Sequence, residues 1–336
     1  MYIKNISLTN FRNHSDYHLD FNLDTTLITG ENGCGKTSVL EAIYILTNGK
    51  SFRATDPEIM KRGTEFYRIE LYYDNGEKVT ATYDGMIKTF TSFDKKSRRL
   101  PKKARYPVIL FEPSDLNLIS GSPSRHRDYF NRFFGELSDE YQSSASRYDK
   151  ALRQRNELLK HENIDSSALF SWNLLLAKYG TTLSNIRKKN IAKINERITD
   201  VYHSIADNQD SISLNYQTEL LNITESEYLK KLEQNYEKDR ILGHTTFGAH
   251  KDDFEFVFNS KKANGSASRG ENRSIMLALK FIEASTIEEQ LRRKPLILLD
   301  DVFSELDELR RGSLVNNFRN HQVVITSVEP IPHNID

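Results

Sequence analysis

Cysteine is nearly absent from the chain, which has one, Cys34, among 336 residues. A single thiol excludes an internal disulfide and any metal centre built from several cysteines. Long apolar runs are missing too: Leu296–Leu299 is typical, whereas a membrane helix needs roughly 18 apolar residues. The N-terminal segment lacks the apolar core of a signal peptide. We therefore expect a cytoplasmic protein without a membrane partner.

The chain also has no net charge, because its 47 basic residues balance its 47 acidic residues. The charge of the whole chain gives no sign of a nucleic-acid partner, although a local cluster still can. Hydrophobic residues make up 38% of the chain, which is enough to bury a sizeable core in one large or two moderate domains. We find no internal repeat and no long low-complexity segment.

A phosphate-binding loop is the clearest motif present. The stretch GENGCGKTS matches G-x-x-x-x-G-K-[ST]; the strand-like TTLIT precedes it, and apolar residues at helical spacing follow it. Small glycines let backbone N–H groups face phosphate oxygens, while Lys36 is expected to reach the β and γ phosphates and Thr37 to bind Mg²⁺. The motif predicts ATP and Mg²⁺ as cofactors. The predicted nucleotide contacts are Gly30, Glu31, Asn32, Gly33, Cys34, Gly35, Lys36, Thr37 and Ser38.

Two adjacent carboxylates follow an apolar run in PLILLDDVFSELD. The run predicts a buried parallel strand that ends at the sheet edge where α/β proteins bind ligands. Asp300 is the expected Mg²⁺ partner, and Asp301 is placed to orient or activate the attacking water. We therefore predict Lys36, Asp300 and Asp301 as the catalytic residues.

A second anion site is possible in NGSASRGENRSIMLALKF. Ser268, Gly270 and Glu271 stand where an amphipathic helix is expected to begin, and the N-terminus of a helix attracts anions. The same residues also fit an ordinary helix cap, in which Glu271 is a first-turn acid. The local pattern leaves both interpretations open.

The order of the expected elements indicates an α/β nucleotide domain interrupted by helices. Strands are expected at IKNISLTNF and TTLIT, and a hairpin turns at Asn75-Gly76. Residues 124–209 have helical patterns, strands resume at ISLNY and DFEFVF, and a helix is expected at about 271–290. We place the nucleotide domain at residues 1–120 and 210–336, and the helical lobe at 121–209.

A local basic run, KKSRRLPKKAR, carries seven basic residues in eleven and no acid. Such a run can neutralise a phosphate backbone, and without aromatic residues its binding should tolerate any base sequence. A solvated loop is the competing interpretation. The candidate DNA contacts are Lys95, Lys96, Arg98, Arg99, Lys102, Lys103 and Arg105. Arg187–Lys189 is a weaker second candidate.

Taken in order and spacing, the motifs resemble the RecF family over essentially the whole chain. The resemblance rests on LTNFRNH, NGCGKTSVLEAIYIL, FEPSDLNLISGSPSRHRDYF, LRQRNELL, GAHKDDFEF, SRGENRSIMLALK and LLDDVFSELD. It implies an SMC-like ABC-type ATPase head with an N-terminal antiparallel β layer and an inserted helical lobe. It also implies a weak ATPase that dimerises on ATP.

The resemblance assigns further residues. Ser268, Arg269, Gly270 and Glu271 would form the signature motif, which contacts the γ-phosphate held by the other subunit. Asp307 would cross the dimer seam, and Arg12 and Asn13 would contact the base or sugar. Family members usually carry two glutamines where this chain has Glu271 and Asn272. Cys34 stands where family members usually carry glutamine or another small polar residue, and we expect its side chain to point away from the phosphates.

The function implied by the resemblance is recombinational repair and replication. The closed dimer would hold double-stranded DNA near single-strand junctions, recruit RecR, help to load the RecA recombinase at gaps and take part in the SOS response. ATP hydrolysis, stimulated by DNA, would then release the DNA.

Two alternatives compete with this interpretation. A metabolic phosphotransferase would need an acceptor pocket and would have no use for the Ser-Arg-Gly-Glu element. Another ABC-type ATPase, such as a transporter motor, a structural SMC head or an overcoming-lysogeny-like enzyme, would share the motifs. SMC proteins carry long heptad segments and the lysogeny-type enzymes a nuclease domain, and because the chain ends at Asp336 we expect neither.

Overall fold

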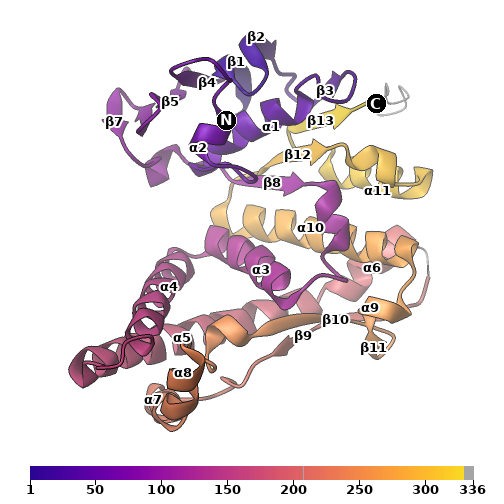
Figure 1. Cartoon of the computed structure of the whole chain (residues 1–336). Helices are drawn as coiled ribbons and strands as arrows, with labels where there is room; N and C mark the ends of the chain where they lie inside the picture. The colour runs from indigo at the N-terminus through magenta and orange to yellow at the C-terminus, as the bar shows by residue number, and fades with distance from the viewer. Residues whose placement is uncertain (207, 329–336) are drawn as a thin grey trace. The chain divides into compact units, whose positions relative to one another are not determined.

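The computed structural model describes residues 1–206 and 208–328. The chain divides into two compact units, one formed by Met1–Asp115 together with the segment from Ala284 onward, the other by Leu116–Glu283. Figure 1 shows the consequence for the first unit: strands from the two ends of the chain, indigo and yellow, lie in the same sheet. No helix in the described ranges is both long and apolar enough to cross a membrane.

A six-stranded antiparallel sheet forms one layer of the first unit, in the order β2-β1-β4-β5-β6-β7. Apolar and polar residues alternate along its central strands, so one face is buried. The hairpin expected at Asn75-Gly76 joins two of these strands, with Gly76 at a φ of 82°. The strands are β1 (Ile3–Phe11), β2 (His14–Asp20), β4 (Tyr67–Tyr73), β5 (Lys78–Tyr83), β6 (Lys88–Ser92) and β7 (Lys95–Ser97).

A four-stranded parallel sheet forms the second layer, in the order β3-β13-β12-β8. Its strands are β3 (Thr25–Thr29), β8 (Val108–Phe111), β12 (Leu296–Asp300) and β13 (Val323–Ser327). All five residues of β12 are buried, as expected for a central parallel strand. The shared direction brings the carboxyl ends of β3, β12 and β13 to one edge.

The helix α1 (Lys36–Asn48) contacts strands of both sheets, and eleven of its thirteen residues are buried. It begins at Lys36, inside the phosphate-loop motif, and is capped at its C-terminus by Gly49, whose φ of 87° suits only glycine well. The short α2 (Asp56–Ile59) and the helix α11 (Glu308–Phe318) complete this unit, with 3₁₀ turns at Lys102–Ala104 and Val302–Glu305.

The second unit combines helices with a small antiparallel sheet, ordered β11-β10-β9. Its strands are β9 (Ile212–Gln217), β10 (Asp253–Phe258) and β11 (Lys261–Lys262). Its helices are α3 (Pro123–Leu137), α4 (Asp139–Leu159), α5 (Ser166–Asn195), α6 (Ile198–Ala206), α7 (Glu225–Gln234), α8 (Tyr236–Leu242), α9 (Ala263–Ser266) and the first part of α10 (Arg269–Leu291). A 3₁₀ turn lies at Ala249–Lys251, and another at Pro113–Asn117, where the chain passes from the first unit to the second.

Two ion pairs formed by arginine are buried inside this second unit. Arg155 pairs with Asp239 at 2.8 Å, and Arg187 pairs with Asp252 at 2.6 Å, all four side chains being almost fully buried. Arg187 also donates to the hydroxyl of Tyr141. The weaker DNA candidate at 187–189 is therefore wrong for Arg187, because a buried and paired guanidinium does not reach a phosphate backbone.

The expected strands, the helical block and the helix near 271–290 are all present. The structure adds elements that the sequence patterns did not indicate: β2, β6, β7, β8, β11, α2, α7, α8, α9 and α11. The compact units divide the chain after residues 115 and 283, whereas the sequence analysis divides it after residues 120 and 209. The functional boundaries of the nucleotide domain and the helical lobe stay a prediction.

Candidate nucleotide site

The phosphate-loop motif forms a tight turn between β3 and α1. Gly33 and Gly35 have φ values of 84° and 107°, a region that side chains other than glycine avoid. The ammonium group of Lys36 donates to the carbonyl oxygens of Gly30 at 2.7 Å and Glu31 at 3.1 Å. The lysine therefore lies inside the curve of the loop, where phosphate oxygens would be cradled.

A cavity of about 790 Å³ opens at this loop, within the size range of small-molecule sites. Every lining residue belongs to the first unit. Of the predicted contacts in the loop, Gly30, Glu31 and Cys34 are not in the lining, and neither is the predicted Mg²⁺ partner Asp300; Cys34 is exposed. The lining consists of Arg12, Asn13, Asn32, Gly33, Gly35, Lys36, Thr37, Ser38, Arg53, Glu58, Met60, Lys61, Arg62 and Asp301.

The first predicted carboxylate contacts the loop directly. Asp300 Oδ1 accepts hydrogen bonds from the hydroxyl groups of Thr37 and Thr326, both at 2.8 Å. Burial raises the pKa of Asp300 above its ordinary value, although both hydrogen bonds oppose the rise. A carboxylate held in this way is ready to accept a cation.

The second carboxylate has an unusual backbone. Asp301 has a φ of 50°, a left-handed conformation that is uncommon outside glycine. Its N–H donates to the carbonyl oxygen and the hydroxyl group of Thr326. Its Oδ1 is buried and has no hydrogen-bond partner among residues 1–206 and 208–328. Such an oxygen is available to a water molecule or a metal-bound ligand.

The site fits Mg²⁺ held jointly by protein and nucleotide. No cluster of three or more metal-binding side chains occurs in the described part of the chain. Mg²⁺ differs from ions held in all-protein cages, because it commonly uses one or two carboxylates together with substrate phosphates and water. Thr37 and Asp300 supply such a pair of oxygens.

The β1–β2 turn closes one side of the loop. Asn13 donates to the carbonyl oxygen of Gly33 at 3.1 Å, and His14 Nε2 lies 3.2 Å from the carbonyl oxygen of Gly35. Lys61 donates to the backbone carbonyl of Asn13 at 3.2 Å. These contacts position Asn13 at the cavity, and the preceding residue, Arg12, also lines it.

Sequence reasoning missed several lining residues, including Arg53, Met60, Lys61 and Arg62. They follow α1 in the segment SFRATDPEIMKR, which contains none of the nucleotide-binding motifs described in the sequence analysis. The density of basic residues shortly after the loop helix is the sequence signal that could have indicated these lining residues.

Ser268, Arg269, Gly270 and Glu271 lie in the second unit at the start of α10. Glu271 accepts a hydrogen bond from the N–H of Ser268 at 2.5 Å and donates its own N–H to the Ser268 hydroxyl at 3.3 Å. This reciprocal pair is a capping box. Ser268 and Arg269 are exposed. The helix-cap interpretation is thus confirmed locally, and an anion contact at the same place stays a prediction.

Asp307 caps another helix, since its side chain accepts from the N–H of Arg310 at 3.0 Å at the start of α11. The carboxylate also pairs with the side chain of Arg310. Its predicted role at a dimer seam stays a prediction.

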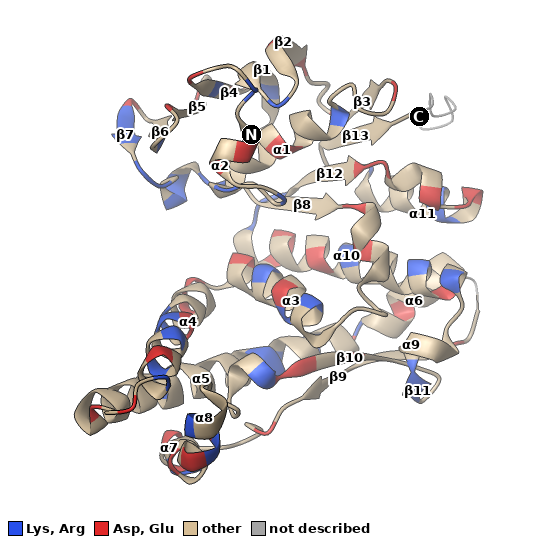
Figure 2. Ribbon diagram, viewed as in Figure 1, with Lys and Arg blue, Asp and Glu red and all other residues tan. Residues whose placement is uncertain are grey.

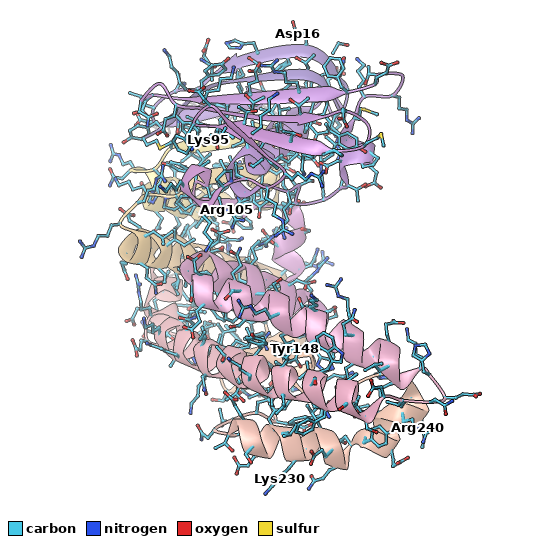
Figure 3. The ribbon with its side chains drawn as sticks, turned by 90° about the vertical axis from the view of Figure 1, so that its left-hand side faces the viewer. Asp16, Lys95, Arg105, Tyr148, Lys230 and Arg240 are labelled. Carbon is cyan, nitrogen blue, oxygen red and sulfur yellow. The ribbon has the colours of Figure 1, made fainter. Side chains whose placement is uncertain are left out.

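The basic run occupies β7 and the segment after it, which is blue in Figure 2. Six of its seven basic residues are exposed, and Arg105 is half-buried. Figure 3 labels Lys95 and Arg105, the two ends of the run, on the first unit. The run is thus partly an outer strand rather than a loop throughout.

Comparison with known proteins shows similarity to an ATPase family and to DNA replication and repair proteins. The family model described as AAA ATPase domain matches residues 1–330. The DNA replication and repair protein RecF of Clostridioides difficile (strain 630) is 32% identical over 98% of this chain and 92% of its own. A solved structure of the recombination mediator protein RecF with ATPrS is 27% identical, covers 98% of this chain and 93% of its own, and has a TM-score of 0.88.

A more distant match shows the fold alone. An SMC head bound to the C-terminal winged-helix domain of ScpA is 14% identical and has a TM-score of 0.55. Together the matches confirm the predicted fold class, an α/β ABC-type ATPase head with an antiparallel β layer and inserted helices, and the predicted ATPase activity. The chain belongs to the RecF family of DNA replication and repair proteins.

Proposed function

We propose that the chain is an ATP-controlled DNA-binding protein of recombinational repair and replication. Two copies close around two ATP molecules, the closed dimer holds double-stranded DNA near single-strand junctions, and slow hydrolysis reopens it. The observation that carries this proposal is the 2.8 Å hydrogen bond from Thr37 in the phosphate loop to Asp300 on β12. It joins the two motifs that every P-loop ATPase needs for a magnesium-bound triphosphate.

The nucleotide chemistry follows from the residues at the cavity. Backbone N–H groups of the loop and Lys36 bind the β and γ phosphates. Thr37 and Asp300 would hold Mg²⁺, which would neutralise charge on the phosphates. Asp301 orients the attacking water through its unpartnered oxygen. Water attacks the γ phosphorus and ADP leaves, so the useful product is the change between closed and open dimer.

The dimer is supported by the start of α10. Ser268 and Arg269 are exposed at the N-terminus of a 23-residue helix, where hydroxyl, guanidinium and backbone N–H groups suit a phosphate. Each copy would present this element, with Gly270 and Glu271, to the γ-phosphate bound by its twin. Asp307 would lie at the same seam.

DNA binding is supported by the basic run from Lys95 to Arg105 on the first unit. Six exposed cations and no acid in this run would release counterions from a phosphate backbone. Contact with the backbone alone explains binding that tolerates any base sequence. DNA would stimulate hydrolysis by favouring the closed dimer.

Partners are inferred from relatives. A relative is titled a recombination mediator of the RecFOR pathway, and we extend to this chain RecR binding, assistance to RecA loading and a part in the SOS response. We also propose a cytoplasmic location, because the protein would meet these partners there.

The test is to measure the mass of the protein by light scattering with and without Mg²⁺-ATP, then with a gapped duplex. We expect monomers without ATP, dimers with ATP, and DNA bound by the dimer. Lys36→Ala should abolish ATP binding and dimers together. A dimer that forms equally well in Lys36→Ala with ATP would contradict the model, and undiminished ATP affinity in that variant would relocate the nucleotide site.

A further inference from the structure

Another pocket, of about 660 Å³, lies on the six-stranded sheet of the first unit, and we call it the sheet pocket. Its volume is within the range of small-ligand sites. It shares no lining residue with the nucleotide cavity, but it includes Lys96, one of the predicted DNA contacts. The lining consists of Arg68, Gly76, Glu77, Lys78, Thr80, Thr82, Thr91, Ser92, Phe93, Asp94 and Lys96.

The floor of the sheet pocket carries hydroxyl groups. Thr91 is paired with Thr80 on one side and with Lys96 on the other, so these three side chains share one face of the sheet. Thr82 lies two positions beyond Thr80 on β5 and therefore on the same face, whereas Ala81 between them is buried in the core. Because a hydroxyl group both donates and accepts hydrogen bonds, this floor suits polar ligands of either kind.

The charges around the sheet pocket largely cancel. Glu70 accepts from Arg68 at 2.9 Å and from Lys78 at 2.5 Å, so both cations already have a partner. The lining also contains two acids against its remaining cation, Lys96. A phosphate by itself would gain little in such surroundings. A neutral group with hydrogen-bonding edges fits them better.

Phe93 lines the sheet pocket in an unusual backbone conformation. Phe93 and Asp94 form the turn between β6 and β7, since Ser92 and Lys95 on either side of them are paired. Their φ values are 50° and 55°. A two-residue turn of this kind favours glycine, asparagine or aspartate, and a bulky residue at positive φ is strained. Phe93 is also 48% exposed. The aromatic ring thus stands at the pocket at a cost to folding, and strained residues of this kind concentrate at functional sites.

We propose that the sheet pocket accepts an unpaired nucleobase, which stacks on Phe93 and hydrogen-bonds to the threonine hydroxyls while the basic run holds the phosphates of the same strand. Lys96 belongs to both the pocket and the run and so joins them. Stacking on an aromatic ring tolerates every base, because each base has a π-face. Bases inside a duplex are stacked on one another and cannot enter. The pocket therefore selects a single-stranded nucleotide beside a duplex.

The inference rests on the proposed binding of DNA by the basic run, and it supplies what the run lacks. The run from Lys95 to Arg105 has no aromatic residue. Phosphate contacts carry no information about the bases, so the run alone does not distinguish a gapped duplex from an intact one. Phe93 stands two positions before the run, in the turn that joins the neighbouring strands β6 and β7 (Figure 2). The preference for single-strand junctions would thus be a property of the first unit.

The test measures the affinities of the full chain, with Mg²⁺-ATP, for an intact duplex and for the same duplex with a gap in one strand. We expect the wild-type protein to prefer the gapped duplex. Phe93→Gly removes the ring and suits a φ of 50°, so the variant should fold as well as the wild type. It should lose about tenfold in affinity for the gapped duplex and keep its affinity for the intact one. Phe93→Trp retains a stacking ring and should retain the preference.

A matched control is Phe66→Ala. Phe66 is 43% exposed in the same unit, but it is outside the lining of the sheet pocket. This variant should keep the wild-type ratio of the two affinities. A fluorescent adenine analogue at the unpaired position gives a second measurement, because its emission depends on stacking. The emission should change when the wild-type protein binds and should stay constant with Phe93→Gly.

Three results would overturn the inference. One is a Phe93→Gly variant that keeps the wild-type ratio of gapped to intact affinity. Another is an equal loss of affinity for both duplexes, which would show that Phe93 only shapes the phosphate-binding surface. The third is a wild-type protein that binds both duplexes equally well, which would leave the proposed DNA binding in place. If reversing the charge of the basic run left DNA affinity unchanged, the proposed DNA surface itself would be wrong, which is a separate failure.

Discussion

Thr37 donates a 2.8 Å hydrogen bond to Asp300 although 263 positions separate them in the chain. The contact exists because β3 and β12 end at the same edge of the parallel sheet, with β13 between them. Thr326 at the end of β13 donates to the same carboxylate oxygen. Strands β12 and β13 and the helix α1, which follows β3, thus converge on one carboxylate, and its charge is the first quantity to test.

Asp300→Asn should separate metal binding from stability. The amide cannot replace a carboxylate toward Mg²⁺, so Mg²⁺-ATP affinity should fall about 100-fold, in line with several kcal/mol of metal–phosphate stabilisation. Burial raises the folded-state pKa of Asp300, so the folded chain binds this proton more tightly than the unfolded one, and charge at neutral pH costs stability. The variant should therefore melt at the same or a higher temperature without nucleotide.

Calorimetric titration and thermal unfolding measure these two effects. Asp20→Asn, which changes an exposed carboxylate at the end of β2, serves as the control and should alter neither. A clear loss of stability in Asp300→Asn, with Mg²⁺-ATP affinity unchanged, would contradict the role given to Asp300.

Asp301→Asn should trap the ATP-bound state. The proposed role is to orient the attacking water, so hydrolysis should fall about 100-fold or more while ATP still binds. The variant should then accumulate as a dimer in the presence of ATP. Phosphate release and light scattering test the two parts. A variant that binds ATP but stays monomeric would remove the support for the trans-acting Ser268 element.

Reversing charge at Lys95, Arg98, Lys102 and Arg105 should weaken DNA binding and its dependence on salt. Each lost phosphate contact lowers the slope of log affinity against log salt by about 0.9, so four contacts predict a change of about 3 to 4. Titration of duplex DNA at several salt concentrations gives the slope. The control reverses Lys188 and Lys189, exposed residues of α5. A larger effect from the control would move the DNA surface to the helical unit.

His250 should make the second unit sensitive to mild acid. Its Nδ1 lies 2.8 Å from the Tyr148 hydroxyl and its Nε2 lies 2.9 Å from the Thr245 carbonyl oxygen. Burial lowers its pKa from 6.5 to about 4. Between these values the unfolded chain binds a proton that the folded chain does not. The contribution of His250 to the free energy of unfolding should therefore be fully present above pH 6.5. The free energy of unfolding should fall by about 3 kcal/mol on acidification to pH 4.

Urea unfolding at several pH values, followed by the fluorescence of the single tryptophan, Trp172, measures this slope. His250→Gln should flatten the dependence between pH 4 and 6.5, whereas His161→Gln, at an exposed position, should not. An equal slope in both variants would assign the acid sensitivity to other groups.

The sequence predicted what local patterns encode. Strand alternation around Asn75-Gly76, the apolar run before Asp300 and the helical spacing after Thr37 all correspond to observed elements. The phosphate loop and the acidic strand end could be paired in advance because parallel strands end at one edge. Family, fold and ATPase activity followed from the order of the motifs.

What could not be predicted depends on contacts between distant segments. Nothing in the sequence near Glu41 reveals that Arg12 and Arg53 converge on it, because the convergence is set by how β1 and the segment after α1 meet that helix. The role of Arg187 was misjudged for the same reason: a basic triplet on a helix looks exposed until its partner, Asp252, is known.

The position of β7 gives the basic run a second effect. It is one of the two edge strands of the six-stranded sheet, and an edge strand offers unpaired backbone groups to any extended chain that lies beside it. Lys95 and Lys96 cover this border with charge, which discourages self-association into larger sheets. After neutral substitutions at these positions, a loss of DNA affinity could not be told apart from aggregation. Substitution by glutamate keeps charge on this edge strand, so the strand still repels other copies.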